Sequence, residues 1–279
     1  MKLKVLNSDP QSMRFLLEET EPAYANALRR VLVSDVPKMA IEDVEFHLGP
    51  IRADDGKEYE SVSPLFDEII SHRLGLVPIP TDLGIYNRRE DCPTCHGEGC
   101  PNCTIIYSVN KRGPSVVTSG DLEPIGDTKL RPSDLKIPIV KLGDGQAMLV
   151  YATAILGTGK DHAKWQATHG VGYRYYPLLK AGSKALDPLD SAVPFCESHM
   201  QSTATEEEET VVLSDDCTTC KKFIDQYKVE SVKVGNDPTR IVMEFETDGS
   251  LSTKSALIAG LDILSTRFSD LSTQAATFA

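Results

Sequence analysis

Cysteine is the residue type whose spacing in this chain carries the clearest chemistry. The chain has 7 cysteines, and four of them form two CxxC pairs: Cys92, Cys95, Cys100 and Cys103. Two such pairs can bring four thiolates to one ion, and tetrahedral zinc takes four sulfur ligands at about 2.3 Å. We therefore predict a structural zinc site, because four thiolates leave no open position for a substrate. An iron–sulfur centre, a redox dithiol pair and an empty remnant are the alternatives, and His96 is at best a spare ligand.

A second group of cysteines follows much later in the chain. It consists of Cys196, Cys217 and Cys220. Cys217 and Cys220 begin a CxxCxxC pattern of the ferredoxin type, but Phe223 stands where the next ligand belongs. Three thiolates can hold a three-iron cluster at most, and a loop with free thiols is the alternative. The odd cysteine total favours metal ligands or free thiols over a disulfide framework.

The composition argues against nucleic-acid and membrane functions. The chain of 279 residues has 41 acidic and 29 basic side chains, a net charge of −12. Proteins that hold nucleic acid by neutralising phosphates carry a basic patch, whereas the basic residues here are scattered. The start of the chain has no apolar run behind its lysines, and no stretch is long and apolar enough to span a bilayer. We therefore expect a protein that is neither secreted nor embedded in a membrane and that makes no direct contact with nucleic acid.

Catalytic patterns are also missing from the sequence. Gly157-Thr-Gly-Lys160 approaches a phosphate-binding loop, but Asp161 stands where that loop needs a hydroxyl. No Cys, Ser or Asp has the local context of an activated nucleophile, and no paired carboxylates stand out. The candidate acid–base side chains are His72, Arg73, His162, Lys164 and His169. We predict that the chain has no catalytic residues.

The elements that must position these side chains are expected in an α+β order. Strands are predicted at 2–6, 13–18 and 41–48. A helix is predicted from Pro22, which suits a first turn, to the break at Pro37. A second helix is predicted to begin at Ser63–Pro64 and to run through Leu74.

The second half of the chain has three further patterns. Short apolar runs from Ile105 to Leu156 predict a β-rich region, and 181–227 is polar and loop-like. Residues 228–247 predict a hairpin with its turn at Asn236–Pro238. The final helix, predicted over Ser252–Leu271, has an apolar stripe. Such a stripe can pack within the chain or pair with a second subunit.

Four segments, in order, resemble the RNA polymerase alpha-subunit family. They are 26–37 with 40–42 following, 66–78, 157–165 and 244–252. They are spread over nearly the whole chain. The third segment contains Gly157–Lys160, so the resemblance replaces the phosphate-loop interpretation of those residues. The cysteine-rich insertions make the chain most similar to the archaeal D branch of this family, which is related to the third-largest subunit of the eukaryotic enzymes.

The resemblance implies an α+β fold with a discontinuous, alpha-subunit-like dimerisation domain. That domain would consist of 1–45 and 228–279. A β-rich domain would be inserted at 46–177 and contain the cysteine knuckle at 92–103, placed like the zinc loop of the eukaryotic relative. A ferredoxin-like insertion would occupy 178–227, and Phe223 marks it as degenerate.

The resemblance also implies a function and a cytoplasmic setting. The chain would be a non-catalytic assembly platform of an archaeal DNA-directed RNA polymerase, pairing with the small subunit L so that the large catalytic subunits can assemble. The implied interface residues are Asn26, Leu28, Arg29, Arg30, Asp67, Glu68, His72, Arg73, Leu257, Leu261, Leu264 and Phe268. The first two helices would face the large subunits and the last would pair with L. The alternative function is an iron–sulfur or dithiol redox protein that uses the CxxC groups.

Overall fold

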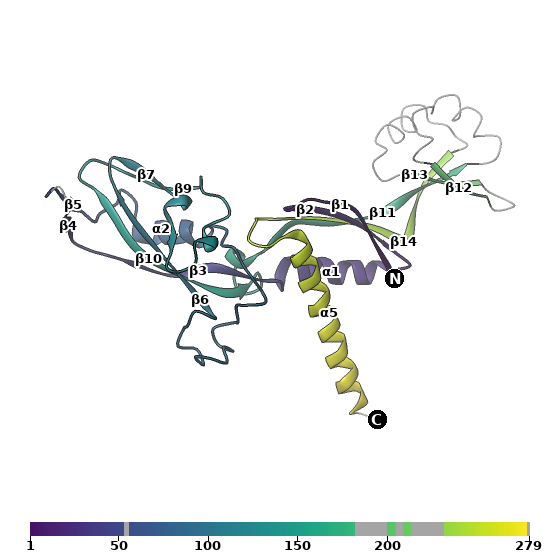
Figure 1. Cartoon of the computed structure of the whole chain (residues 1–279). Helices are drawn as coiled ribbons and strands as arrows, with labels where there is room; N and C mark the ends of the chain where they lie inside the picture. The colour runs from purple at the N-terminus through teal and green to yellow at the C-terminus, as the bar shows by residue number, and fades with distance from the viewer. Residues whose placement is uncertain (53–55, 182–199, 205–208, 214–231, 278–279) are drawn as a thin grey trace. The chain divides into compact units, whose positions relative to one another are not determined.

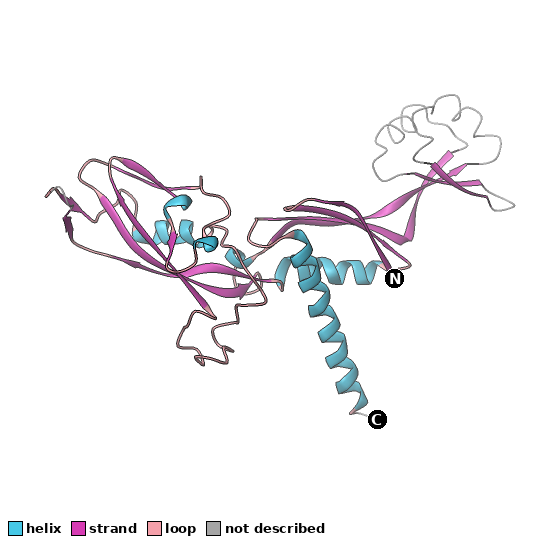
Figure 2. Cartoon of the chain, viewed as in Figure 1, coloured by secondary structure: helices cyan, strands magenta, loops and turns pink. Residues whose placement is uncertain are grey.

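The computed structural model describes residues 1–52, 56–181, 200–204, 209–213 and 232–277 (Figure 1). Strands predominate over helices in this part of the chain (Figure 2). The mixture is compatible with the predicted α+β class. The chain divides into two compact units, of which the first is 1–8, 13–29 and 172–244 and the second is 9–12, 30–171 and 245–279.

Most of the first unit is a sheet built from distant parts of the sequence. Its described strands are β1 (Lys2–Ser8), β2 (Ser12–Glu18), β11 (Thr168–Ala181), β12 (Met200–Ala204), β13 (Glu209–Leu213) and β14 (Val232–Thr247). Their order across the sheet is β1-β2-β14-β11-β13-β12. β1 and β2 are antiparallel, with Lys2 opposite Glu18. The two strands predicted near the start of the chain are confirmed.

Helix α1 (Pro22–Ser34) is confirmed as predicted. Proline is favourable at its first position, because the fixed φ suits the helix and the missing N–H needs no partner there. Its buried side chains recur at helical spacing and are Ala25, Leu28, Val31 and Leu32. Of the apolar stripe in the sequence, Leu28, Val31 and Leu32 are buried as expected, whereas Ala23 is exposed.

Two predictions for the second half of the chain are wrong. Residues 232–247 form the single strand β14 rather than a hairpin. The side chain of Asp237 accepts hydrogen bonds from the Thr239 N–H and hydroxyl at 2.9 and 2.6 Å, so the turn chemistry is satisfied without reversing the chain. Residues 181–227 are not wholly loop-like either, because β12 and β13 pair within them, and Val211 and Val212 favour a strand.

The second unit contains the β-rich region that the sequence predicts. Its main sheet has the order β3-β10-β6-β8, formed by β3 (Pro37–Phe46), β6 (Thr104–Arg112), β8 (Glu123–Pro124) and β10 (Ala147–Thr158). Two smaller ladders pair β4 (Pro50–Arg52) with β5 (Glu58–Glu60) and β7 (Ser115–Thr118) with β9 (Pro138–Leu142). Alternating residues of β6, such as Ile105, Tyr107 and Val109, are buried in the core, as half-buried strands require.

Helix α2 (Asp67–Gly75) begins later than predicted. Ser63 does not start the helix, because its hydroxyl bonds locally to the backbone of Leu65, donating to the carbonyl at 2.6 Å. Phe66 is the N-cap and is extended, with ψ 146°. Ile70 and Leu74 enter the core of the second unit, whereas Phe66 and Ile69, which belong to the same apolar pattern in the sequence, are exposed.

Helix α5 (Thr253–Ala276) is confirmed and extends beyond Leu271. Ser252 caps it, accepting a hydrogen bond from Ser255 N at 3.1 Å. Its buried residues are Thr253, Ala256, Leu257 and Gly260, all in its first turns. Within the described residues, no helix is long and apolar enough to cross a membrane.

Candidate metal centre and interaction surfaces

The knuckle brings four sulfur atoms to one place. The Sγ atoms of Cys92, Cys95, Cys100 and Cys103 all lie within 4.8 Å of one another. Three of the separations are 3.6 Å (Cys92–Cys100), 3.5 Å (Cys95–Cys103) and 3.8 Å (Cys100–Cys103). Four sulfurs at about 2.3 Å from a tetrahedral ion lie about 3.8 Å apart, so the donor set fits a single metal ion.

Two tight turns create this arrangement. His96 N donates to Cys92 O at 2.9 Å, and Cys103 N donates to Cys100 O at 2.9 Å. The segment between the pairs includes Gly97 and Gly99 at φ +100° and +101°. A side chain is strained in that conformation, so glycine is the residue suited to both positions. His96 is exposed and is not part of the sulfur cluster.

Backbone amides point at the sulfurs. Gly99 N lies 3.3 Å from Cys95 Sγ, and Cys100 N lies 3.2 Å from Cys103 Sγ. The amides of Thr94 and Cys95 lower the pKa of Cys92 to about 6. Burial raises the pKa of Cys103 to about 12. The amides favour the thiolate, which is the metal-binding form, whereas burial makes the charge of Cys103 costly unless a cation offsets it.

Cys196, Cys217 and Cys220 lie outside the described residues.

On α1, the predicted interface residues differ in exposure. Leu28 is buried within this chain, whereas Arg30 is exposed. Asn26 Oδ1 accepts two hydrogen bonds from Arg29, from Nε at 3.1 Å and Nη2 at 3.0 Å. The amide of Asn26 therefore holds the Arg29 guanidinium one turn along the helix.

On α2, the four predicted residues are exposed. Asp67 and Glu68 lie in the first turn and His72 and Arg73 in the last, so the charges complement the helix dipole. Arg73 Nη1 also donates to the carbonyl of Ile139 at 2.6 Å, which ties the end of α2 to β9.

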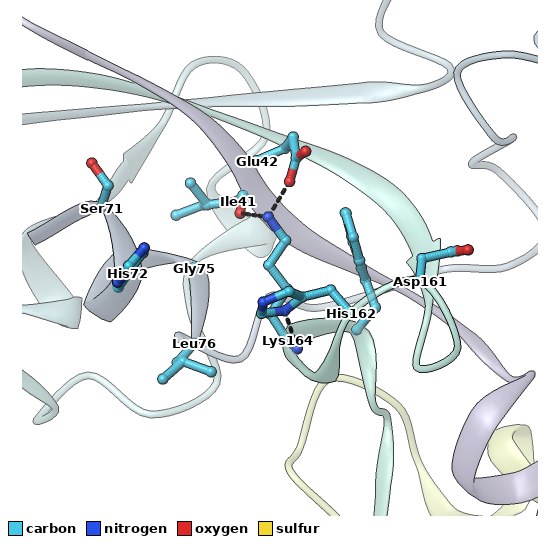
Figure 3. A pocket seen from close by; sticks show the side chains of 10 residues that line it. Ile41, Glu42, Ser71, His72, Gly75, Leu76, Asp161, His162 and Lys164 are labelled. Atoms are coloured by element: carbon cyan, nitrogen blue, oxygen red, sulfur yellow. Dashed lines mark hydrogen bonds and ion pairs between the residues drawn. The ribbon is translucent and has the colours of Figure 1, made fainter. Parts of the chain in front are cut away.

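A pocket of about 610 Å³ lies beside α2 (Figure 3). Its walls come from α2, β3 and the third family-like segment: Ile41, Glu42, Ser71, His72, Gly75, Leu76, Asp161, His162, Lys164 and Trp165. Lys164 donates to Ile41 O at 3.1 Å, pairs with Glu42, and lies 4.4 Å from the centre of the Trp165 ring. Three of the candidate acid–base side chains, His72, His162 and Lys164, therefore line one pocket. The ammonium group of Lys164 is already bound by Ile41 O and Glu42. His169 instead pairs with Glu246 at 3.2 Å.

The third segment and the start of β11 together brace the end of α1, a role that sequence reasoning missed. Lys160 N donates to Ser34 O at 2.8 Å, and the Thr168 hydroxyl donates to Leu32 O at 2.7 Å. These bonds satisfy carbonyls that lack partners at a helix end. A Cβ at Gly159 would lie 2.6 Å from Val33 O, so the glycine permits the close approach.

A turn at Asp161 shapes the same segment. Its carboxylate accepts hydrogen bonds from Thr158 N at 3.1 Å, the Thr158 hydroxyl at 2.7 Å and Arg88 Nη2 at 2.8 Å. The bonds from Thr158 and the nearby arginine lower the pKa of Asp161. The aspartate that breaks the phosphate-loop pattern is thus a structural acceptor.

On α5, the apolar stripe is only partly covered by the described chain. Leu257 is 6% exposed, whereas Phe268 and Leu271 are 52% and 59% exposed. Leu261 and Leu264 are intermediate. Large exposed apolar side chains in a row are typical of a protein–protein contact.

The second unit also contains an ion pair whose lysine is buried. Lys38, whose side chain is 4% exposed, pairs with Asp248. Asp248 Oδ1 accepts from Ser250 N at 3.0 Å and from its hydroxyl at 2.5 Å. Sequence reasoning missed the pair, because its members are far apart in the chain and meet only in the tertiary fold.

Fold and surfaces together define an α+β protein with a tetrathiol knuckle and a helix that presents uncovered apolar side chains. Residues 14–268 match the RNA polymerase Rpb3/Rpb11 dimerisation domain, and the chain belongs to this family. It is 43% identical to DNA-directed RNA polymerase subunit Rpo3 of Thermoplasma volcanium, over 96% of this chain and 97% of that protein. The Rpo3 subunit of Picrophilus torridus is also 43% identical, over 96% and 97%. That of Methanosarcina acetivorans is 31% identical, over 95% and 94%.

Proposed function

We propose that this chain is a non-catalytic assembly subunit of an archaeal DNA-directed RNA polymerase, located in the cytoplasm. The observation that carries the proposal is the similarity to Rpo3 subunits over almost the full length of both proteins. The resemblance of four sequence segments to the archaeal branch of the alpha-subunit family agrees with these relatives. The family match favours this function over the iron–sulfur or dithiol redox alternative.

The partner in this proposal is the small polymerase subunit L. The matched family is a dimerisation domain, and α5 has exposed apolar residues that a partner helix could cover. Leu261, Leu264 and Phe268 are the side chains we assign to this contact, with Leu257 holding the helix to its own chain. The dimerisation domain would comprise 1–45 and 228–279.

The large subunits would then assemble on α1 and α2. The exposed charges of α2 and the exposed Arg30 of α1 support this role. Asn26, Arg29, Asp67, Glu68, His72 and Arg73 complete the proposed contact set, while buried Leu28 supports α1 from within. No direct contact with nucleic acid is needed for this function.

The remaining regions are proposed as insertions. A β-rich domain would occupy 46–177 and hold one structural zinc ion at Cys92, Cys95, Cys100 and Cys103. The clustering of the four sulfurs supports the site, and their number favours zinc over an open catalytic ion. A degenerate ferredoxin-like insertion would occupy 178–227, with Cys196, Cys217 and Cys220 holding a three-iron cluster at most.

Co-expression with subunit L from the same organism tests the assembly function. We expect an equimolar complex in size-exclusion chromatography that recruits the large subunits when they are added. Subunit L alone, mixed with the large subunits, is the control. Failure to bind subunit L would contradict the proposal. An ultraviolet–visible spectrum with a broad iron–sulfur absorption, together with redox turnover by the isolated chain, would favour the alternative.

A further inference from the structure

An arginine outside the cysteine knuckle holds the segment that joins the two CxxC pairs. The guanidinium of Arg89 donates from Nε to Gly97 O at 3.0 Å and from Nη2 to Glu98 O at 3.2 Å. Both carbonyls belong to the segment between Cys95 and Cys100. One planar side chain therefore restrains two successive peptide groups, which a flexible ammonium group would not do equally well.

One of these carbonyls shares its peptide group with an amide that reaches a sulfur. The peptide bond between Glu98 and Gly99 is trans. Its C=O and N–H therefore point in opposite directions. The C=O faces the Arg89 guanidinium, and the N–H of Gly99 faces Cys95 Sγ, with N···S 3.3 Å. Fixing the carbonyl thus fixes the direction of the hydrogen bond to the sulfur.

Arg89 is itself anchored on two sides. Its Nη1 lies 3.7 Å from Asp43 Oδ2 on β3. Its backbone carbonyl accepts the N–H of Cys92 at 3.4 Å, at the start of the knuckle. The side chain is 35% exposed, so it is partly shielded from solvent. The guanidinium of Arg89 is always positively charged. Four thiolates around a divalent ion leave a net negative charge, which this positive charge partly offsets.

We infer that Arg89 is a positioning residue for the metal centre. It orients the Glu98–Gly99 peptide so that its N–H stabilises the Cys95 thiolate. The inference rests on the proposed metal site and adds to it a residue that binds no metal. Groups that orient metal ligands from the outside typically change metal affinity by about 10–100-fold when they are replaced.

The test compares Arg89→Met, Arg89→Lys and Arg88→Met in the full-length chain. Arg88 is a matched control, because its side chain is 40% exposed and pairs with Asp161 at 2.8 Å instead of with the knuckle. Zinc affinity is measured by competition with a chromophoric chelator, and Co²⁺ is used as a spectroscopic probe. Melting of the metal-free variants reports stability separately.

We expect Arg89→Met to lose about 10–100-fold in zinc affinity and to shift the sulfur-to-cobalt charge-transfer band, because one sulfur loses its hydrogen bond. Arg88→Met should have the zinc affinity and the cobalt charge-transfer band of the wild type. The zinc affinity of Arg89→Lys should lie between those of Arg89→Met and the wild type, because lysine keeps the positive charge but lacks the planar guanidinium that bonds both carbonyls. A shifted band cannot arise from a general loss of stability alone.

Three results would overturn the inference while leaving the metal site in place. They are wild-type affinity in Arg89→Met, full affinity in Arg89→Lys, and an unshifted cobalt band combined with a lower melting temperature of metal-free Arg89→Met. Absence of metal binding by the wild-type chain would instead refute the proposed metal centre itself, and the inference with it.

Discussion

Single side chains in this protein hold together segments that lie far apart in sequence. Lys38 and Asp248 are the clearest case, because the lysine is almost fully covered by protein. A buried charge depends on its partner, since the protein interior does not solvate it as water does. The pair therefore joins the beginning of β3 to the chain that precedes α5.

Replacing Lys38 with Met tests this dependence. The variant leaves Asp248 without its cation, and we expect a loss of about 3 kcal/mol in the free energy of unfolding, measured with urea. The double variant Lys38→Met with Asp248→Asn is the control, because it removes both charges and should recover part of the loss. Wild-type stability in the single variant would show that the ion pair contributes nothing.

The knuckle shows how far spacing alone can predict a site. Two CxxC pairs predicted that four sulfurs would meet, and the structure brings them within 4.8 Å. Spacing could not predict Arg89, because the hydrogen bonds that it makes depend on the path of the backbone through positive φ values. Nor could it pair Lys38 with Asp248, since such contacts arise only from the tertiary fold.

At the scale of elements, amphipathic patterns predicted where the helices lie. Local turn and capping signals were less reliable, since they gave a wrong hairpin and a wrong helix start. The buried stripes of α1 and α2 matched the sequence in part, because helical spacing determines which side chains share a face but not how much of that face the fold covers. Asn236–Pro238 wrongly predicted a chain reversal. The side chain of Asp237 makes its local hydrogen bonds to Thr239 while the backbone continues as a strand. Ser63 gave a wrong prediction of the helix start for a similar reason. It lies three residues before Phe66, the N-cap of α2, and its hydroxyl bonds to the backbone of Leu65 instead of capping the helix.

The segment that braces α1 gives a prediction at this scale. In Gly159→Ala, the new Cβ would meet Val33 O at 2.6 Å, and a backbone oxygen cannot move away cheaply. We expect a loss of about 1–3 kcal/mol in the free energy of unfolding, as for other overpacked sites. Gly84→Ala is the control, because its Cβ would meet only the side chain of Asp82. Equal stability of the two variants would contradict the brace.

At the scale of the whole molecule, the apolar end of α5 has the features of a contact surface. Leu261→Asp would place a charge in the proposed contact with subunit L, and we expect several kcal/mol of association energy to be lost. Phe268→Asp should act similarly without affecting the fold, because Phe268 is 52% exposed in the chain alone. Both are measured by the dissociation constant of the heterodimer.

Thr266→Asp is the control for this pair of variants, because Thr266 is exposed and lies roughly on the opposite side of the helix from Leu261. It should leave association unchanged. Undiminished binding by both Leu261→Asp and Phe268→Asp would mean that the stripe does not contact subunit L.

The order of strands in the larger sheet has a consequence for how this protein is made. β2 emerges from the ribosome early, yet its neighbour on one side is β14, which is synthesised near the end. Pairing across so long a loop is slow and requires that β14 already exist. A nascent chain that has not extended through Thr247 cannot complete the centre of this sheet. A product that ends before Thr247 therefore lacks both the completed sheet and α5.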